Sequence, residues 1–356
     1  MDNSIDKITF DEKGECNYCK NYDEKKRLYG YKGPESDQQF TELIGAIKKV
    51  GKGKEYDCIV GISGGVDSAY LTYLAKKEGL RILAVHVDAG WNSEIAVTNI
   101  QKLCNKLEID LHTVVVDWPA MKELQRAYMF SGIPNLDTPQ DHVFAAAVYE
   151  YAQKYHIYYV LNGSNIATEG ILTEGIEYDT VDFQNIKDIY KKNGRGKKIF
   201  EKIPHFNVWK YIYMQSKVKQ IKLLNYVPYS KTEAIQLLTD QFGWEYYGGK
   251  HYESRFTKFY QGYYLPLKFN WDKRRDHYSC LILNEELTRS EAIEKLKRDD
   301  DINEKIEDRD YVLKKLDITP EEWKKILEAS VKTEDDYKNS KRIIETFVTL
   351  KHLIAG

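Results

Sequence analysis

The sequence predicts an α/β protein with a doubly wound, mostly parallel sheet, and three observations support this prediction. Short apolar runs rich in β-branched residues alternate with longer segments of helical periodicity between residues 56 and 161. A glycine-rich turn at residues 63–68 separates the first apolar run from the first helical segment. The 356 residues are 42% apolar, which is enough for a core, and a prior of roughly 150 residues per domain gives two or three domains.

Four strands are predicted in this region, and each is a short apolar run. They cover residues 56–62, 81–87, 111–116 and 158–161. Helices are predicted between them at residues 68–78, 92–107 and 140–155, where apolar residues recur at helical spacing. Alternation of this kind covers a parallel sheet on both faces and places a ligand at the carboxyl ends of the strands.

Composition divides the chain into four segments. Residues 1–55 are polar and carry a Cys-x-x-Cys pair, and residues 56–230 hold the α/β domain. Residues 231–284 are aromatic and basic, as expected of a lid over a substrate, and residues 285–356 form a helical, highly charged region. In that last region Thr319-Pro320-Glu321-Glu322 predicts a helix start with a capping box.

The charge balance argues against some classes of partner. Lys plus Arg is 53 and Asp plus Glu is 55, so charge alone would not bind long nucleic acid. No apolar run approaches the roughly 20 residues that span a bilayer, and the first residues lack the pattern of a secretory signal. Five cysteines are too few for a disulfide framework. We therefore expect a cytoplasmic protein with no membrane partner.

The strongest functional signal is Ser63-Gly64-Gly65-Val66-Asp67-Ser68, between the first strand and the first helix. Two glycines let the backbone turn tightly with its N–H groups toward an anion, and the helix start behind them adds a positive dipole end. Ser63 and Ser68 can bind phosphate oxygens, and Asp67 can hold Mg²⁺. No lysine follows the glycines, so the turn differs from the phosphate loop of ordinary NTPases. The alternative is a plain strand–helix turn.

Residues 63–68 resemble the SGGxDS loop of the PP-loop ATP pyrophosphatases, which cleave ATP between the α and β phosphates. The resemblance implies that this loop binds the pyrophosphate portion and that residues 85–88 meet adenine and ribose. It also implies a nucleotide-contacting turn at residues 161–165, for which an ordinary turn is the alternative. The ATP-binding residues expected on this basis are Gly61, Ser63, Gly64, Gly65, Asp67, Ser68, Val87, Asp88, Gly163 and Ser164.

A longer resemblance, over about residues 10–295, narrows the family. The Cys-x-x-Cys pair and residues 162–169, 247–258 and 271–275 are similar to the N-acetyl sugar amidotransferases of bacterial surface-polysaccharide and nonulosonic-acid pathways. The resemblance implies that an acetamido group of a nucleotide-linked sugar becomes an acetamidino group. It further implies the use of ATP and Mg²⁺, and of ammonia from a separate glutaminase subunit.

The expected chemistry requires activation of the amide, because its oxygen is a poor leaving group. Attack of that oxygen on the α-phosphorus would release pyrophosphate, which calls for fixed cations and donors. Position 2 is Asp2 and no cysteine lies in a Gly-x-Cys-x-Gly setting, so the chain lacks a glutaminase nucleophile of either kind. Catalytic candidates are Asp67, Lys250, Lys273 and Arg275, with Arg255 as a further cation; each cation could instead be a surface charge.

Polar residues after the nucleotide turn are candidates for binding sugar hydroxyls or the acetamido group, with a solvated loop as the alternative. They are Asn165, Glu169, Tyr178, Asp182 and Asn185.

The cysteine pair raises the question of a metal. Cys16 and Cys19 have zinc-knuckle spacing but supply two ligands, and His277 and Cys280 form a remote pair of matching spacing. Together they would make a tetrahedral structural zinc site. The resemblance supports the cysteine pair and His277, but the family pattern has a serine in place of Cys280, so His251 is the alternative ligand. Two surface thiols are the other interpretation.

Two rival functions are weighed against the amidotransferase. A PP-loop enzyme that modifies tRNA, for instance by thiolation, would need a basic face and a sulfur-handling cysteine near the nucleotide. A non-catalytic nucleotide sensor or scaffold would not need the intact Asp67 and Ser68. The sequence favours the amidotransferase.

Overall fold

A five-stranded parallel sheet forms the centre of the protein in the order β3-β2-β1-β4-β5. The computed structural model describes residues 1, 5, 7–173, 179–249, 251–298 and 301–355. The strands are β1 (Cys58–Gly61), β2 (Ile82–Asp88), β3 (Asp110–Val115), β4 (Tyr159–Leu161) and β5 (Lys219–Ile221). The four predicted strands are confirmed, and β5 is an additional three-residue strand at the edge, paired with β4.

Side chains of the central strands alternate between two cores, which makes the sheet doubly wound as predicted. In β2, Ile82 and Ala84 pack into one apolar cluster, whereas Leu83 and Val85 pack into the other. Four helices cover the first face: α2 (Pro34–Gly51), α3 (Val66–Lys77), α4 (Glu94–Leu107) and α10 (Lys231–Phe242). Four others cover the second face: α5 (Trp118–Met129), α6 (Thr138–Lys154), α8 (Phe183–Asn193) and α9 (Val208–Lys217).

The remaining helices lie at the amino terminus, after β4 and in the carboxy-terminal part. The first two are α1 (Asn17–Tyr29) and α7 (Ile166–Glu169). The carboxy-terminal ones are α11 (Arg255–Phe259), α12 (Leu265–Phe269), α13 (Arg274–Leu283), α14 (Arg289–Arg298), α15 (Ile302–Lys315), α16 (Pro320–Glu328) and α17 (Lys341–Ala355). A π-helix, η3 (Tyr260–Tyr264), joins α11 to α12, and short 3₁₀ turns are η1 (Phe200–Lys202), η2 (Leu223–Tyr226) and η4 (Glu334–Asp336).

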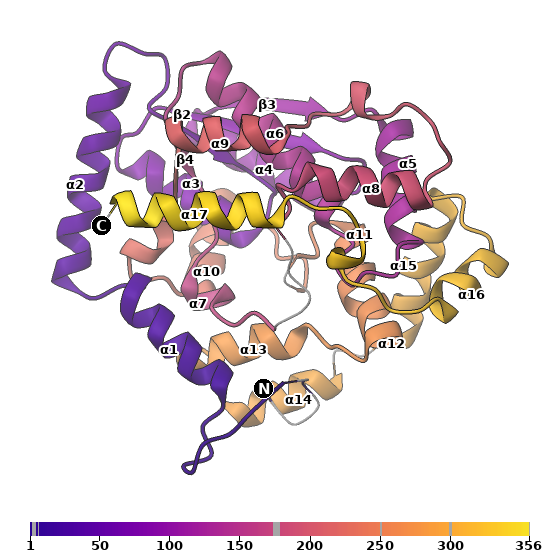
Figure 1. Cartoon of the computed structure of the whole chain (residues 1–356). Helices are drawn as coiled ribbons and strands as arrows, with labels where there is room; N and C mark the ends of the chain where they lie inside the picture. The colour runs from indigo at the N-terminus through magenta and orange to yellow at the C-terminus, as the bar shows by residue number, and fades with distance from the viewer. Residues whose placement is uncertain (2–4, 6, 174–178, 250, 299–300, 356) are drawn as a thin grey trace.

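The carboxy-terminal region is part of the main core. One apolar cluster contains Tyr56, Phe256 and Ile344, so it continues from the sheet into the last helix. The predicted capping box is confirmed, because Thr319 and Glu322 bond each other's backbone at the start of α16. Figure 1 shows α17 beside α9 and α1 beside α13. None of the helices in the described part is long and apolar enough to cross a membrane.

Candidate functional site

The glycine-rich loop between β1 and α3 is held by the hydroxyls of its two serines. Gly65 N donates to Ser63 Oγ at 3.3 Å, and Ser68 Oγ donates to the carbonyl oxygen of Gly65 at 3.1 Å. Ser63 N donates to Ser68 Oγ at 3.3 Å, and the two Oγ atoms lie 3.2 Å apart. The loop is therefore folded onto the first turn of α3, a twelve-residue helix whose N-terminal amides favour an anion.

Two glycines, Gly64 and Gly163, allow close backbone contacts at this loop. Gly64 has φ +85°, and a Cβ at this position would lie 2.6 Å from the carbonyl oxygen of Ala96 in α4. Gly163, in the turn after β4, would place a Cβ 3.1 Å from the backbone nitrogen of Ser68. The turn after β4 thus packs directly on the loop, and the close backbone approach expected at Gly163 is an approach to the loop itself.

A cavity of about 330 Å³, here called the loop cavity, opens at the carboxyl ends of β1, β2 and β4. Its position agrees with the general rule for ligand sites in open parallel sheets. Its lining consists of Gly61, Ile62, Ser63, Gly65, Val66, Asp67, Ser68, Val85, His86, Val87, Asn92, Gln140, Asp141, Phe144, Val148, Asn162, Gly163, Ser164, Glu169, Lys231, Tyr247, His251, Glu253 and Ser254.

Asp67 is fixed by hydrogen bonds to both of its carboxylate oxygens. The hydroxyl of the buried Tyr229 donates to Oδ1, and Thr168 Oγ1 donates to Oδ2 at 3.5 Å. Burial and the negative charge of Asp67 hold the pKa of Tyr229 well above its ordinary value, so the phenol remains a donor. Glu169 supplies a second carboxylate to the loop cavity. Such oxygen donors fit Mg²⁺, and Asp67 and Glu169 are the residues that would hold it.

The wall formed by β2 is ordered by a buried histidine. His86 Nδ1 lies 3.0 Å from the carbonyl oxygen of Ile62, and Nε2 lies 3.1 Å from the amide nitrogen of Asn92. Because the Asn92 amide is a donor, Nε2 accepts and Nδ1 carries the proton. Asp88 does not line the loop cavity, and its carboxylate accepts from Gly90 N at 2.8 Å and from Asn92 Nδ2 at 3.2 Å.

The opposite wall comes from Tyr247, His251, Glu253 and Ser254, far along the chain. Glu253 Oε1 lies 3.0 Å from the position of a Cβ on Gly65, and His251 Nδ1 lies 3.7 Å from the same oxygen. Burial acts to raise the pKa of Glu253, but bonds with His251 and Tyr247 outweigh it and lower the pKa. Ser93 N donates to the carbonyl oxygen of Glu253 at 2.8 Å, and Asn92 and Ser254 form an antiparallel bridge.

A larger cavity of about 620 Å³, the basic cavity, adjoins the loop cavity. Lys231 and Tyr247 line both cavities. Seven cationic side chains and four carboxylates occur among the described residues that line the basic cavity. The cations are Lys231, Lys258, Lys273, Arg274, Lys295, Arg298 and Lys305. Six aromatic side chains complete this lining: Tyr246, Tyr247, Tyr252, Phe259, Tyr263 and Tyr278.

The structure brings most of the predicted ATP-binding residues together. Gly61, Ser63, Gly65, Asp67, Ser68, Val87, Gly163 and Ser164 all line the loop cavity. Gly64 and Asp88 do not line it, because Gly64 packs on α4 and Asp88 bonds the turn after β2.

The predicted substrate and catalytic residues are more widely spread. Glu169 lines the loop cavity and Lys273 the basic cavity, where its Nζ lies 3.3 Å from Asp276. Asn165 caps α7, and Asp182 caps α8, while Asn185 donates to the carbonyl oxygen of Glu334 at 2.9 Å. Arg275 lines neither cavity, and Arg255 is 2.9 Å from Asp308. Lys250 and Tyr178 lie outside the described residues.

The zinc prediction is not supported. Cys16 Sγ and Cys19 Sγ lie 3.3 Å apart at the start of α1, shorter than the ~3.8 Å that two sulfurs 2.3 Å from a tetrahedral zinc would keep. Cys280 Sγ accepts from Ile171 N at 3.2 Å, and His277 instead lines the basic cavity with its ring 5.7 Å from that of His251. Within the described ranges no three such side chains gather around a common point.

Tyr229 and Lys231 were not predicted from the sequence; Tyr229 lies two residues before α10, and Lys231 is the first residue of this helix. In the sequence they follow a proline and precede an ordinary amphipathic helix, so no local pattern distinguishes them from a surface turn. Glu253 stands inside a stretch singled out for its family resemblance, but only its lysine and arginine neighbours suggested a role.

Comparison with protein families divides the chain into two matched regions. Residues 57–164 match the model described as "Queuosine biosynthesis protein QueC". Residues 253–351 match the model described as "LPS biosynthesis protein WbpG-like, C-terminal domain". The first region contains the loop and the second begins at Glu253, which faces it.

Curated relatives match part of the chain. A tRNA(Ile)-lysidine synthase of Chlamydia pneumoniae is 30% identical over 90 residues, 22% of this chain and 28% of that protein. The tRNA-specific 2-thiouridylase MnmA 2 of Fusobacterium nucleatum is 26% identical over 118 residues, 31% of this chain and 34% of that protein. The chain thus spans about a third or less of the length of these relatives.

Among solved structures, the NH3-dependent NAD synthetase from Campylobacter jejuni in complex with the nitrate ion aligns with a TM-score of 0.30 at 17% identity. The alignment covers 58% of this chain and 93% of that one. The family resemblance rests instead on the loop, the strand order and the two matched regions. The chain combines a QueC-like region that carries the loop with a WbpG-like carboxy-terminal domain, as expected of a PP-loop protein.

Proposed function

We propose that the chain is an ATP-dependent amidotransferase that converts the N-acetyl group of a nucleotide-linked sugar into an acetamidino group. ATP would yield AMP and pyrophosphate, and a separate glutaminase subunit would supply ammonia. The observation that carries the proposal is the wall shared by the loop cavity and the basic cavity, formed by Lys231 and Tyr247. This arrangement suits a reaction in which ATP meets a second, negatively charged substrate.

The first step joins the acetamido oxygen to the α-phosphorus of ATP. As the new P–O bond forms, the bond from this phosphorus to the oxygen that bridges it to the β-phosphorus breaks, and pyrophosphate leaves. The loop amides and the start of α3 would stabilise its charge. Mg²⁺ held by Asp67 and Glu169 would neutralise phosphate charge when bound.

The second step uses the lone pair of ammonia. The nitrogen attacks the imidate carbon, the C–O bond to AMP breaks, and a proton from the nitrogen passes to solvent or stays on the amidinium product.

The basic cavity supports a nucleotide-linked acceptor. Its excess of three cationic over anionic side chains among the described lining residues favours a diphosphate, whereas the whole chain has a net charge of −2. Its aromatic side chains could stack on a base. Lys231, at the boundary of the two cavities, is the described cation that best fits both phosphate-bearing substrates.

The test is incubation with ATP, Mg²⁺, ammonium chloride and a panel of UDP- or CMP-linked N-acetyl sugars. We expect release of AMP and pyrophosphate that depends on one acceptor, together with an amidine product detected by mass spectrometry. Asp67→Asn should abolish release, while Glu245→Gln, which changes an exposed carboxylate paired with Lys102, should not. Turnover without any N-acetyl sugar, or none with the whole panel, would contradict the proposal.

Modification of tRNA is the second candidate, because the curated relatives are a tRNA(Ile)-lysidine synthase and a tRNA-specific 2-thiouridylase. A thiolation reaction would use a cysteine close to the nucleotide. None of the described residues that line the loop cavity is a cysteine, and burial raises the pKa of Cys104 to about 11. Release of AMP that requires tRNA, and not an N-acetyl sugar, would favour this candidate.

A further inference from the structure

A third cavity, the side cavity, lies on the other side of α7 and Tyr229 from the loop cavity. It has a volume of about 370 Å³ and is lined by α1, α7, the chain before α10 and the turn after α13. Tyr229 lines it while its hydroxyl bonds Asp67 on the loop side, and α7 gives Ala167 to the side cavity and Glu169 to the loop cavity. The two cavities are therefore neighbours across one wall.

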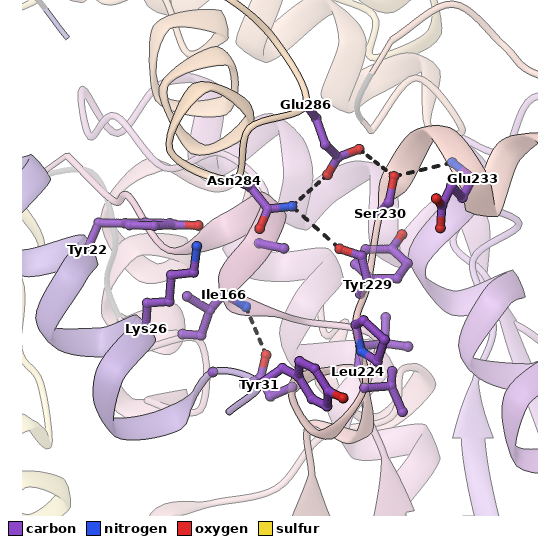
Figure 2. Close-up of a pocket in the computed structure, with 15 residues that line it drawn as sticks. Tyr22, Lys26, Tyr31, Ile166, Leu224, Tyr229, Ser230, Glu233, Asn284 and Glu286 are labelled. Carbon is purple, nitrogen blue, oxygen red and sulfur yellow. Dashed lines mark hydrogen bonds between the residues drawn. The ribbon is translucent and has the colours of Figure 1, made fainter. Parts of the chain in front are cut away.

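The side cavity is lined by a buried tyrosine hydroxyl whose hydrogen-bonding capacity is unsatisfied among the described residues. Tyr22 is 0% exposed, and its Oη has no hydrogen-bond partner among the described residues. Figure 2 shows this hydroxyl directed into the cavity, whose lining also includes Lys26. Buried hydroxyls are normally paired, so this one indicates a missing polar occupant.

The charges of the cavity favour a small cation over an anion. Its described lining carries the carboxylates of Glu233 and Glu286 against the single amine of Lys26. Glu286 is fixed in place, because Oε2 accepts from Ser230 Oγ at 3.0 Å and Oε1 accepts from Asn284 Nδ2 at 2.7 Å. Carboxylates and the tyrosine rings of this lining attract ammonium-like cations.

Glu286 also lines the basic cavity, so one carboxylate faces both spaces. We propose that the side cavity captures ammonium and delivers ammonia to the acceptor, an inference that rests on the proposed function. An N–H bond of ammonium breaks, its electron pair stays on nitrogen, and the proton moves to Glu286 and then to water. The apolar side chains of Ile166 and Leu224 in the lining favour the neutral ammonia.

The experiment compares the ammonium dependence of amidine formation with acceptor-dependent exchange of pyrophosphate into ATP, which needs no nitrogen. Tyr22→Phe and Glu233→Gln should each raise the KM for ammonium chloride about threefold, and Lys26→Gln should lower it by a similar factor. The rate of pyrophosphate exchange should change by less than about twofold in each of these variants. Of the three cavities, their side chains line the side cavity alone. Tyr264→Phe, which removes another buried hydroxyl outside the three cavities, should change neither quantity.

Unchanged ammonium KM values, or equal losses in both assays, would overturn the proposal. If no acceptor supports exchange of pyrophosphate into ATP, the proposed function fails. A second measurement then tests cation binding in the side cavity by itself. Crystals of the full chain soaked in rubidium chloride, whose cation is close to ammonium in size, should show an anomalous peak between Tyr22 and Glu286. Glu286→Gln should remove this peak, and a wild-type cavity without it would overturn the assignment.

Discussion

Replacing Tyr229 by phenylalanine tests whether the bond to Asp67 prepares the loop cavity for nucleotide. The substitution removes one hydroxyl and keeps the buried ring, which contacts Tyr70 with centroids 5.4 Å apart. Asp67 Oδ1 then loses the Tyr229 donor, and Thr168 remains at 3.5 Å from Oδ2. We expect weaker use of Mg²⁺ and ATP, because the carboxylate would no longer be held in one orientation.

The magnitude follows from the kind of bond that is removed. A hydrogen bond to a charged group contributes about 1.5–3 kcal/mol, and the buried Tyr229 is in the middle of that range because Thr168 compensates only in part. A loss of about 2 kcal/mol corresponds to a decrease of about 30-fold in kcat/KM for ATP. The assay is acceptor-dependent pyrophosphate release, measured over a range of ATP and Mg²⁺ concentrations.

Tyr70→Phe is the matched control, since it removes a neighbouring hydroxyl that is not bonded to Asp67. Urea unfolding of both variants separates a loss of positioning from a loss of fold. The reasoning is refuted if Tyr229→Phe keeps the wild-type kcat/KM and Mg²⁺ dependence, or if Tyr70→Phe reduces them equally.

Three further predictions concern stability, the loop and the metal. Burial lowers the pKa of His142 from 6.5 to about 4, and its neutral form bonds Thr180 O and Phe206 N. The neutral form should therefore contribute about 3 kcal/mol to the free energy of unfolding above pH 6.5, and this contribution should be lost as the pH falls toward 4. In urea unfolding, His142→Gln should lose less stability over this pH range than the wild type. An identical dependence of stability on pH in the two proteins would contradict the prediction. Gly163→Ala should lower ATP turnover about tenfold, because the new methyl group would displace the backbone of the loop at Ser68. Gly45→Ala should not lower it, because a Cβ at Gly45 has nothing within 4 Å. Equal effects of the two substitutions would contradict a role of the close contact at Gly163. EDTA should stop turnover and added Mg²⁺ restore it, and activity that persists in EDTA would exclude the metal role of Asp67.

The sheet was predictable because its strands are continuous apolar runs between helices of clear periodicity. β5 was not, because it is three residues long, begins with lysine and pairs on one side only at the sheet edge. The helices α1 and α2 were also not predicted within the polar segment 1–55, since their stabilising contacts are made with distant elements. Contacts with elements that are distant in the sequence cannot be predicted from the local sequence pattern.

The loop side of the candidate site was predictable for a similar reason. Its glycines, serines and aspartate are contiguous and serve one local turn, so their chemistry is visible in six residues. The opposite wall is assembled by tertiary packing, which brings Lys231 and Glu253 to the loop from separate segments. The zinc prediction is not supported although Cys16, Cys19 and Cys280 share one apolar cluster, because Cys280 Sγ accepts from Ile171 N and His277 lines the basic cavity.

The bridge between Asn92 and Ser254 limits how far the two matched regions can be exchanged independently in evolution. The QueC-like region ends at Ser164 and the WbpG-like domain starts at Glu253, but backbone bonds from Ser93 and Arg255 join the two at the rim of one cavity. A chimera that grafts another carboxy-terminal module onto this sheet would lose Glu253 and Ser254 from the wall of the loop cavity, together with part of the lining of the basic cavity. A change of ligand in either cavity is therefore expected from point substitutions within the two joined regions, and not from exchange of one region.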